Sequence, residues 1–599
     1  MVEELRADLE RVRHPSDGGG RAWISKAEPE TVRAGERGRW RIEYEVGPEG
    51  ISVGGTVFLQ VSPYWGWSTP QNLEPSAPGY TVVKTDADGV TLEVTTVDQQ
   101  LMAIRIAGRG LEPGERLTVD YGAGVAGATA DRFAESESRF WIAVDGDGDG
   151  IRGLLADSPT IVVVAGLARR LLLLVPSTAK PGDVLQLRAV ALDSAGNAGA
   201  EIDDTCDLQA QPGLEMPASF ALHTDSGSFA TVQFTSSDEG IVRLRAQCST
   251  GLEAESNPLM VLTEDLPILW GDLHGHSALS DGTGTPEDYF SYARDIAALD
   301  VVALTDHDHY GLRFLSQSPD LWQEIVENVE AFHEPPALVT VLGYEWTNWT
   351  YGHRHVLYFD DSQDLLSAVD PRYDSPPELW DALRGRQALT FAHHSAGGPV
   401  AVDWSIPPDP VLEPLTEIVS AHGSSEASDS PHRIYSPLAG NFVRDVLNQG
   451  YRLGFVGSGD GHDGHPGLTH LSYPTGGLAA ILTGNRTRLG ILEALRARRV
   501  YATNGPRIIL RASLDGHRMG STLPAPGTGT LRFLVISEQP IERIDLIRRD
   551  RPILQITGDG SRLASFENSI DGLERGGYLY VRVVQTDGGA AWSSPFFFE

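Results

Sequence analysis

Side chains that bind metal ions are concentrated in one part of this 599-residue chain. Fourteen of the seventeen histidines lie between His274 and His470, and most stand in short polar segments that follow apolar runs. These segments are LHGHSALSDG (273–282), TDHDH (305–309), GYEW (343–346), GHRH (352–355), FAHH (391–394) and GSGDGH (457–462). Nitrogen and carboxylate ligands without cysteine favour Zn²⁺, Mn²⁺ or Fe²⁺. The pattern predicts a site for two or three divalent ions.

The first two segments place candidate ligands at the ends of strand-like runs. His274 and His276 are two residues apart, so on an extended backbone both rings face the same side. Asp281 follows in a Ser-Asp-Gly turn, and the run VVALT leads into Asp306 and His307. We predict His274, His276, Asp281 and His307 as metal ligands and Asp306 as a catalytic group.

Glu345 ends the third run, ALVTVLGYE, which is strongly apolar. A carboxylate there is costly to bury unless it binds a cation or a strong hydrogen-bond donor. Its two oxygens also allow it to bridge two ions. We therefore predict Glu345 as a bridging ligand.

Two histidine pairs leave the choice of ligand open. GHRH offers His353 or His355, and FAHH offers His393 or His394, whose side chains point to opposite faces if the segment is extended. We expect one histidine of each pair to bind an ion and the other to contact the substrate.

The remaining candidates lie near the last segments. Asp460 and His462 are two apart after the run LGFVGS, and both are predicted ligands. His422, in IVSAHGSSE, could donate a proton to the leaving group, hold the substrate, or be a histidine without a role. Arg354 is expected to steady the substrate.

Strand-like runs alternate with amphipathic helical segments from 264 to 505, which predicts a parallel barrel or a doubly wound sheet. Parallel strands bring their carboxyl ends to one rim, where ligands far apart in sequence can meet. Residues 22–166, 167–263 and 506–599 are instead rich in short β-type runs separated by turns. They predict three β-sandwich domains, the second immunoglobulin-like.

Composition excludes some partners. The chain carries 82 acidic and 47 basic residues, a formal charge of −35 that disfavours binding to nucleic acid. No apolar run is long enough for a membrane span. The N-terminal segment is charged and lacks a signal-like apolar stretch, so we expect a cytoplasmic protein, or a secreted or periplasmic one if a signal was removed. The oligomeric state is left open.

Two smaller signals lie in the β-rich regions. Cys206 and Cys248 could form one disulfide across a sandwich or remain two separate buried thiols. The segment DGDGDG (145–150) matches the start of a calcium loop, with Asp145, Asp147 and Asp149 as ligands. Ala156 stands where the helical version of that loop has glutamate, so an exposed acidic turn is the alternative.

The ordered segments resemble the PHP (polymerase and histidinol phosphatase) superfamily over about residues 267–505. HGHSALSDG, TDHDH, Glu345, FAHH and GSGDGH match that family's ordered motifs, although His394 replaces a proline and Gly459 interrupts the last motif. The resemblance implies a distorted (β/α)7 barrel that holds Zn, Mn or Fe, here embedded between β modules.

The resemblance also implies a division of the ligands among three ions. The first would be held by His274, His276, Glu345 and Asp460, the second by His355 and His393 with Glu345 shared, and the third by Asp281, His307 and His462.

The resulting hypothesis is a metal-dependent hydrolase of a small phosphate ester. One alternative keeps the ions but changes the bond to a glycosidic, sulfate or carboxylic ester, because Trp346 and Trp349 beside Glu345 could suit a carbohydrate-like substrate. The other alternative is a non-catalytic carbohydrate-binding or adhesion protein.

Overall fold

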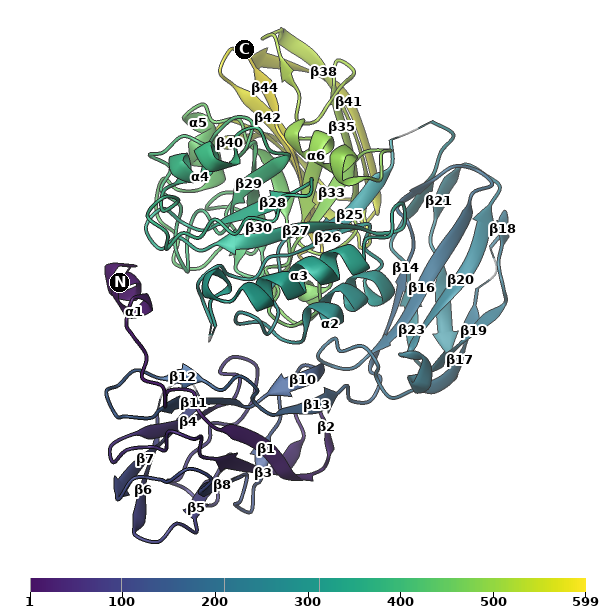
Figure 1. Ribbon diagram of the computed structural model, residues 1–599. Helices are drawn as coiled ribbons and strands as arrows, with labels where there is room; N and C mark the ends of the chain where they lie inside the picture. The colour runs from purple at the N-terminus through teal and green to yellow at the C-terminus, as the bar shows by residue number, and fades with distance from the viewer. Residues whose placement is uncertain (1, 98–99, 210, 265, 312) are drawn as a thin grey trace. The chain divides into compact units, whose positions relative to one another are not determined.

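The computed structural model describes residues 2–97, 100–209, 211–264, 266–311 and 313–599 of the chain (Figure 1). Strands hold 41% of the residues and helices only 10%, so the predicted multidomain, β-rich organisation is confirmed. The chain forms two compact units, Met1–Leu167 with Thr283–Thr285, and Ala168–Gly282 with Pro286–Glu599. None of the helices in the described ranges is long and apolar enough to cross a membrane.

The first unit consists of three small sheets after helix α1 (Val2–Leu9). Their core is aromatic: Trp40 packs against Trp67, Tyr121 and Phe140 with ring centroids 5.3 to 5.8 Å away. The strands are β1 (Arg21–Glu28), β3 (Arg37–Glu45), β8 (Arg116–Tyr121), β5 (Thr81–Thr85) and β9 (Ala128–Thr129); β10 (Glu135–Arg139), β13 (Thr160–Val164) and β2 (Thr31–Arg33); and β12 (Gly153–Leu154), β11 (Trp141–Asp145), β4 (Thr56–Gln60), β7 (Leu101–Gly108) and β6 (Val90–Thr96).

The predicted calcium loop follows β11 in this unit. Both carboxylate oxygens of Asp145 accept backbone N–H groups of the loop, from Gly148 at 2.7 Å and Gly150 at 3.0 Å. Asp149 likewise accepts the N–H of Ile151 at 2.7 Å. The turn therefore holds its shape through its own hydrogen bonds, and calcium binding there stays a prediction.

The second unit begins with three further sheets. They contain β14 (Arg170–Leu174), β16 (Val184–Leu192), β20 (Phe229–Ser236) and β18 (Leu214–Glu215); β19 (Ser219–His223), β17 (Asp203–Leu208), β22 (Arg245–Cys248) and β23 (Glu253–Glu255); and β15 (Thr178–Ala179), β24 (Leu259–Val261) and β21 (Gly240–Val242).

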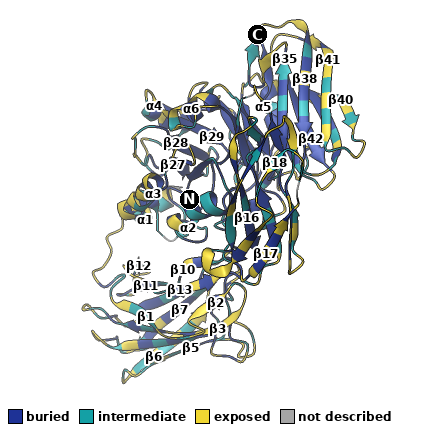
Figure 2. Ribbon diagram, turned by 90° about the vertical axis from the view of Figure 1, so that its right-hand side faces the viewer, coloured by how far each residue is buried: buried dark blue, intermediate teal, exposed yellow. Residues whose placement is uncertain are grey.

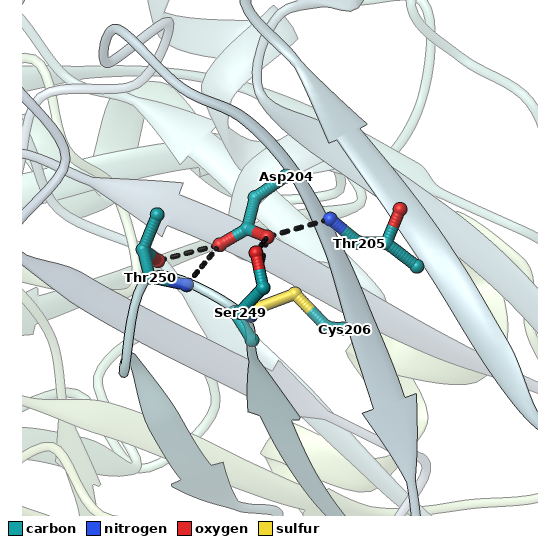
Figure 3. The surroundings of a disulfide bond; sticks show 6 residues. Asp204, Thr205, Cys206, Ser249 and Thr250 are labelled. Atoms are coloured by element: carbon teal, nitrogen blue, oxygen red, sulfur yellow. Dashed lines mark hydrogen bonds between the residues drawn. A yellow bond between two sulfur atoms is a disulfide. The ribbon is translucent and has the colours of Figure 1, made fainter.

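Cys206 and Cys248 form a disulfide in this region (Figure 3). The two residues are direct partners on the neighbouring strands β17 and β22. Of the two alternatives, the disulfide is therefore present, but it joins two strands of one sheet and does not cross the sandwich. Asp204 secures the adjacent turn, because its carboxylate accepts hydrogen bonds from the backbone and hydroxyl groups of Ser249 and Thr250.

The central region is a curled sheet whose strands are buried along their whole length, as the dark blue of β27, β28 and β29 in Figure 2 shows. Burial on both faces explains why the sequence reads as continuous apolar runs. The strands are β25 (Ile268–Asp272), β26 (Val301–Leu304), β27 (Val339–Trp346), β28 (Arg354–Tyr358), β29 (Ala388–Ala392), β30 (Leu415–Ser420), β31 (Gly423–Ser424), β32 (Gly454–Gly457), β33 (Leu478–Leu482) and β34 (Val500–Thr503). The helices are α2 (Pro286–Ser291), α3 (Pro319–Ala331), α4 (Pro376–Leu383), α5 (Val443–Asn448) and α6 (Arg488–Arg496).

Strand directions differ from the all-parallel arrangement predicted from the sequence. The pairs β25–β26, β26–β27, β29–β30 and β30–β32 are parallel, but β28 is antiparallel to both β27 and β29. Only seven residues separate β27 from β28, which is too short for the crossover that a parallel connection requires.

The sheet closes on itself just beyond the ends of β25 and β32. The backbone N–H of Asp460 donates to the carbonyl of His274, and the N–H of His276 donates to the carbonyl of Gly461, both at 2.9 Å. Gly457 allows β32 to approach the next strands, because an added Cβ would lie 2.7 Å from the Thr503 carbonyl oxygen. The first and last ligand segments are thereby brought side by side.

The C-terminal region continues the same sheet. β34 pairs with β43 (Ala590–Ser593), so the predicted boundary at 505/506 does not separate two sheets. The other strands of this extension are β42 (Tyr578–Gln585), β39 (Ile541–Arg548), β40 (Arg551–Thr557), β44 (Phe596–Phe598) and β37 (Thr522–Leu523). A separate sheet holds β36 (His517–Arg518), β35 (Ile509–Leu514), β38 (Gly527–Ile536) and β41 (Leu563–Leu573).

Candidate metal centre

The predicted ligands meet at one end of the curled sheet. His274 and His276 follow β25, His307 follows β26, Glu345 lies near the end of β27, His393 follows β29, and Asp460 and His462 follow β32. β28 runs in the opposite direction, so its beginning, with His353 and His355, lies at this end. The chain direction of β28 explains why the GHRH histidines precede their apolar run while the others follow theirs.

One group of four donor atoms has the spacing of metal ligands. His274 Nε2 lies 3.1 Å from His276 Nε2, 3.4 Å from Glu345 Oε2 and 3.2 Å from Asp460 Oδ1. His276 Nε2 lies 3.5 Å from both carboxylate oxygens. Ligands about 2.1 Å from a shared ion in a tetrahedron are separated by about 3.4 Å. These residues therefore fit one divalent ion.

A second group surrounds Asp281. Its Oδ1 atom lies 3.5 Å from His307 Nε2, 3.4 Å from His462 Nε2 and 3.9 Å from His276 Nδ1. Burial lowers the pKa of His462, but the charge and hydrogen bond of Asp281, together with the charge of Asp460, raise the pKa to about 9. The three ligands predicted for the third ion are thus together, with His276 beside them.

A third group contains the two histidine pairs left open by the sequence. His274, His355 and His393 present nitrogens within 4.8 Å of one another, and so do His353, His393 and His394. In the described part of the chain, neither ring nitrogen of His355, His393 or His394 has a hydrogen-bond partner, although all three residues are buried. Burying so many unsatisfied nitrogens is costly, and a bound cation would satisfy them.

Glu345 connects these groups. Its Oε1 atom lies 2.7 Å from His353 Nδ1 and 3.1 Å from His307 Nδ1, and its Oε2 atom lies 3.4 Å from His393 Nε2. Burial would raise the pKa of this carboxyl, but the surrounding histidines, led by His307, keep it well below its usual value. The arrangement supports the predicted bridging role and makes His353 a rival of His355 for the second ion.

Glu417 is a supporting residue that the sequence analysis missed. Its Oε2 atom lies 3.0 Å from His274 Nδ1, which directs the opposite nitrogen, Nε2, toward the first group. Burial raises the pKa of Glu417 to about 7. The signal that identified Glu345 was present here too, since Glu417 interrupts the apolar run LTEIVS of β30.

Asp272 and Gly459 explain the interrupted last motif. Asp272 Oδ1 accepts the N–H of Gly459 at 2.7 Å, and Oδ2 accepts the N–H of Gly467 at 2.8 Å. A Cβ at Gly459 would lie 2.6 Å from Asp272 Oδ2. The extra glycine lets this loop approach β25 and present Asp460.

Asp306 is not placed among the metal groups. Its carboxylate accepts hydrogen bonds from the backbone and hydroxyl of Ser277 and from the hydroxyl of Ser280. Burial raises its pKa to about 6. Asp306 thus anchors the loop between His276 and Asp281, and its catalytic role stays a prediction.

Two other expectations are corrected by the structure. Arg354 alternates with His353 and His355 along β28 and pairs with buried Glu413, 3.0 Å away, so it does not face the site. Trp346 is fully buried and donates its indole N–H to the Tyr373 carbonyl at 2.9 Å. Neither residue is available to a substrate.

His422 and His394 lie beside the metal groups. His422, in the turn between β30 and β31, has 27% of its side chain exposed, and its Nε2 atom lies 3.1 Å from Asp460 Oδ2. The ring centroid of His394 is 5.7 Å from that of His422 and 5.0 Å from that of His353. These positions suit contact with a substrate.

Comparison with known proteins gives similarity without an assigned activity. A family model described as a protein of unknown function (DUF3604) matches residues 303–397 and 466–514, which include His307, Glu345 and both open histidine pairs. An uncharacterized protein of Chlamydia pneumoniae is 24% identical over 534 residues, covering 82% of this chain and 84% of the relative. An uncharacterized protein of Chlamydia trachomatis serovar D is 25% identical over 398 residues, covering 60% of this chain and 62% of the relative.

Solved structures give weaker similarities. A two-domain protein of Bacteroides vulgatus, described as containing a predicted PHP-like metal-dependent phosphoesterase, is 18% identical with a TM-score of 0.32. That match covers 55% of this chain and 97% of the other. The adhesin InvE of Yersinia pseudotuberculosis is 12% identical with a TM-score of 0.14, over 41% of this chain and 60% of the other.

Removal of His274 should release metal, because this residue belongs to several of the donor groups. We expect His274→Ala to lose bound Zn, Mn or Fe after dialysis, whereas Asp147→Ala, in the acidic turn that follows β11, should keep these ions. Inductively coupled plasma mass spectrometry measures the content of both. Equal metal content in the two variants would contradict the assignment.

Glu417→Gln should weaken metal binding about 10- to 100-fold, because His274 loses the carboxylate that orients it. Glu413→Gln is the matched control, since Glu413 is equally buried but pairs with Arg354 and not with a ligand histidine. Titration against a metal-binding dye gives both affinities. The role of Glu417 is refuted if the two variants bind metal alike.

Proposed function

We propose that this protein is a metal-dependent hydrolase with two or three divalent ions, acting on a small phosphate ester. The observation that carries the proposal is the convergence of seven histidines and three carboxylates from distant segments at one end of the sheet. They are His274, His276, His307, His353, His355, His393, His462, Asp281, Glu345 and Asp460. Zn²⁺, Mn²⁺ and Fe²⁺ match this donor set.

The closure of the strands supports the PHP-like interpretation of the fold. β25, β26, β27, β28, β29, β30 and β32 follow one another in hydrogen-bonded order, and the Gly275–Gly461 bridge joins the last to the first. We propose that this ring is a distorted seven-stranded barrel. Its antiparallel member, β28, is part of the distortion.

Bound ions at this position would polarise an ester oxygen and lower the pKa of coordinated water. The chain itself contributes the positioning. Glu345 holds His353 and His307 by direct contacts, and Glu417 fixes His274. Half-buried His422, next to Asp460, is placed to hand a proton to a leaving group, while His394 and His353 would contact the substrate.

The alternative bond types share this site. Hydrolysis of a glycosidic, sulfate or carboxylic ester bond would use the same ions, and half-buried Trp349 beside His353 is the observation that favours a carbohydrate-like substrate. The nature of the bond is therefore a question for assay.

The test is hydrolysis of nitrophenyl phosphates, sulfates and glycosides by metal-loaded protein, with and without chelator. We expect turnover of a phosphate ester that chelator abolishes and added Zn²⁺ or Mn²⁺ restores. If glycoside turnover is the only chelator-sensitive activity, the phosphoesterase proposal fails.

The disulfide bears on the compartment. Disulfides persist in oxidising compartments and are rare in the cytoplasm, so Cys206–Cys248 argues for a periplasmic or extracellular location over the predicted cytoplasmic one. Thiol alkylation in intact cells before lysis tests this inference. We expect both cysteines to be protected until a reductant is added, and immediate alkylation of both would favour the cytoplasm.

A further inference from the structure

Ring-bearing side chains form a continuous arc beside the metal groups. Successive ring centroids lie 5.1 Å apart for His307–Tyr310, 5.9 Å for Tyr310–Trp349, 5.0 Å for Trp349–His353, 5.0 Å for His353–His394, 5.7 Å for His394–His422 and 5.7 Å for His422–Tyr435. The arc connects segments that are more than 100 residues apart in sequence. Four of its members are the candidate ligand or substrate-contacting histidines described above.

The middle of the arc is buried, and exposure is greater at Trp349 on one side of it and at Tyr435 on the other. His353 and His394 are 2% and 3% exposed, whereas Trp349 is half-buried and Tyr435 is 50% exposed. A molecule whose reacting group lies against the histidines would extend past Trp349 or Tyr435 on its way to solvent. These two rings, and half-buried Tyr310 beside Trp349, are the non-ligand members of the arc that such a molecule would meet.

Trp349 is presented by a fixed turn. The side-chain oxygen of Asn348 accepts the backbone N–H groups of Thr350 and Tyr351 at 2.9 and 2.8 Å. The ring of Trp349 stands edge-on to His353, with an interplanar angle of 88°. Trp346, three residues earlier, is fully buried, so Trp349 is the tryptophan of this segment whose ring retains exposed surface.

Tyr435 is held by the loop that follows His394. The N–H of Gly398 donates to the Tyr435 carbonyl at 3.1 Å. A Cβ at Gly398 would collide with the Tyr435 ring, and a Cβ at Gly397 with its carbonyl oxygen. Two consecutive glycines thus allow the phenol ring to lie directly on this loop, although half of the residue stays exposed.

We propose that Trp349 and Tyr435 recognise the face of a ring in the substrate, so that the enzyme acts on phosphate esters of sugars or aromatic alcohols in preference to acyclic ones. The proposal rests on the proposed function. Aromatic side chains stack on the C–H face of a pyranose or on an arene, and a substrate with an acyclic chain offers them less area. The phosphate esters of sugars and those of aromatic alcohols both offer such a ring face.

Isothermal titration calorimetry of metal-loaded protein with phenylphosphonate and methylphosphonate measures the preference without turnover. We expect the wild type to bind the phenyl compound about 3- to 10-fold more tightly, the range of one aromatic contact. Trp349→Leu and Tyr435→Leu should each reduce this ratio toward one, while Trp349→Phe should retain most of it. Tyr64→Leu is the matched control, because Tyr64 is a 41% exposed tyrosine of the first compact unit.

The same comparison of binding, with glucose 1-phosphate as the ring compound and glycerol 3-phosphate as the acyclic one, distinguishes a sugar from an arene in the same variants. If the leucine variants lose the preference for one of the ring compounds, the inference is supported and the kind of ring that the site recognises is identified. Equal binding of ring and acyclic compounds by the wild type, or a preference unchanged in both leucine variants, overturns it. Ring preference without any chelator-sensitive hydrolysis would refute the phosphoesterase proposal alone.

Discussion

Compensation of buried charge at one end of the curled sheet is the constraint on which the rest of the site depends. Glu345, Asp460 and Asp281 are removed from water, and burial by itself would raise the pKa of each. Contact with several imidazoles reverses that effect and lowers the pKa of all three carboxyl groups. Neither the carboxylates nor the histidines could be buried alone at acceptable cost. Their assembly at one place is therefore a condition of folding.

Closure of the sheet satisfies this condition geometrically. The hydrogen bonds between the His274–His276 and Asp460–Gly461 segments bring the first and last ligands together, and they form where β25 and β32 end. Asp272 holds the loop after β32 and Asp306 holds the loop after β25, each by accepting several backbone or hydroxyl donors. These two carboxylates are not among the candidate ligands, yet they determine where the candidate ligands lie.

The last β-rich region contributes to the same end of the molecule. Glu426, four residues after His422, is buried and accepts hydrogen bonds from Arg444 at 2.6 Å and Arg582 at 2.9 Å. Arg582 belongs to β42, which is joined to the central strands through β43 and β34. Removal of one partner of such a buried ion pair strongly destabilises the folded protein. The C-terminal strands are thus part of the structure that supports the His422 turn.

The sequence by itself indicated the types of the candidate ligands, their recurrence after apolar runs and the β-rich regions, because residue chemistry and period-two patterns are local properties. Glu345 could be predicted since a carboxylate in an apolar run is exceptional. Only the tertiary structure decided that Arg354 faces Glu413, that Asp306 anchors a loop and that Glu417 orients His274, because a strand's two faces and the partners across them depend on contacts between distant segments. The antiparallel direction of β28 and the continuity of the sheet beyond residue 505 were decided in the same way, since local patterns specify a strand but not its neighbours.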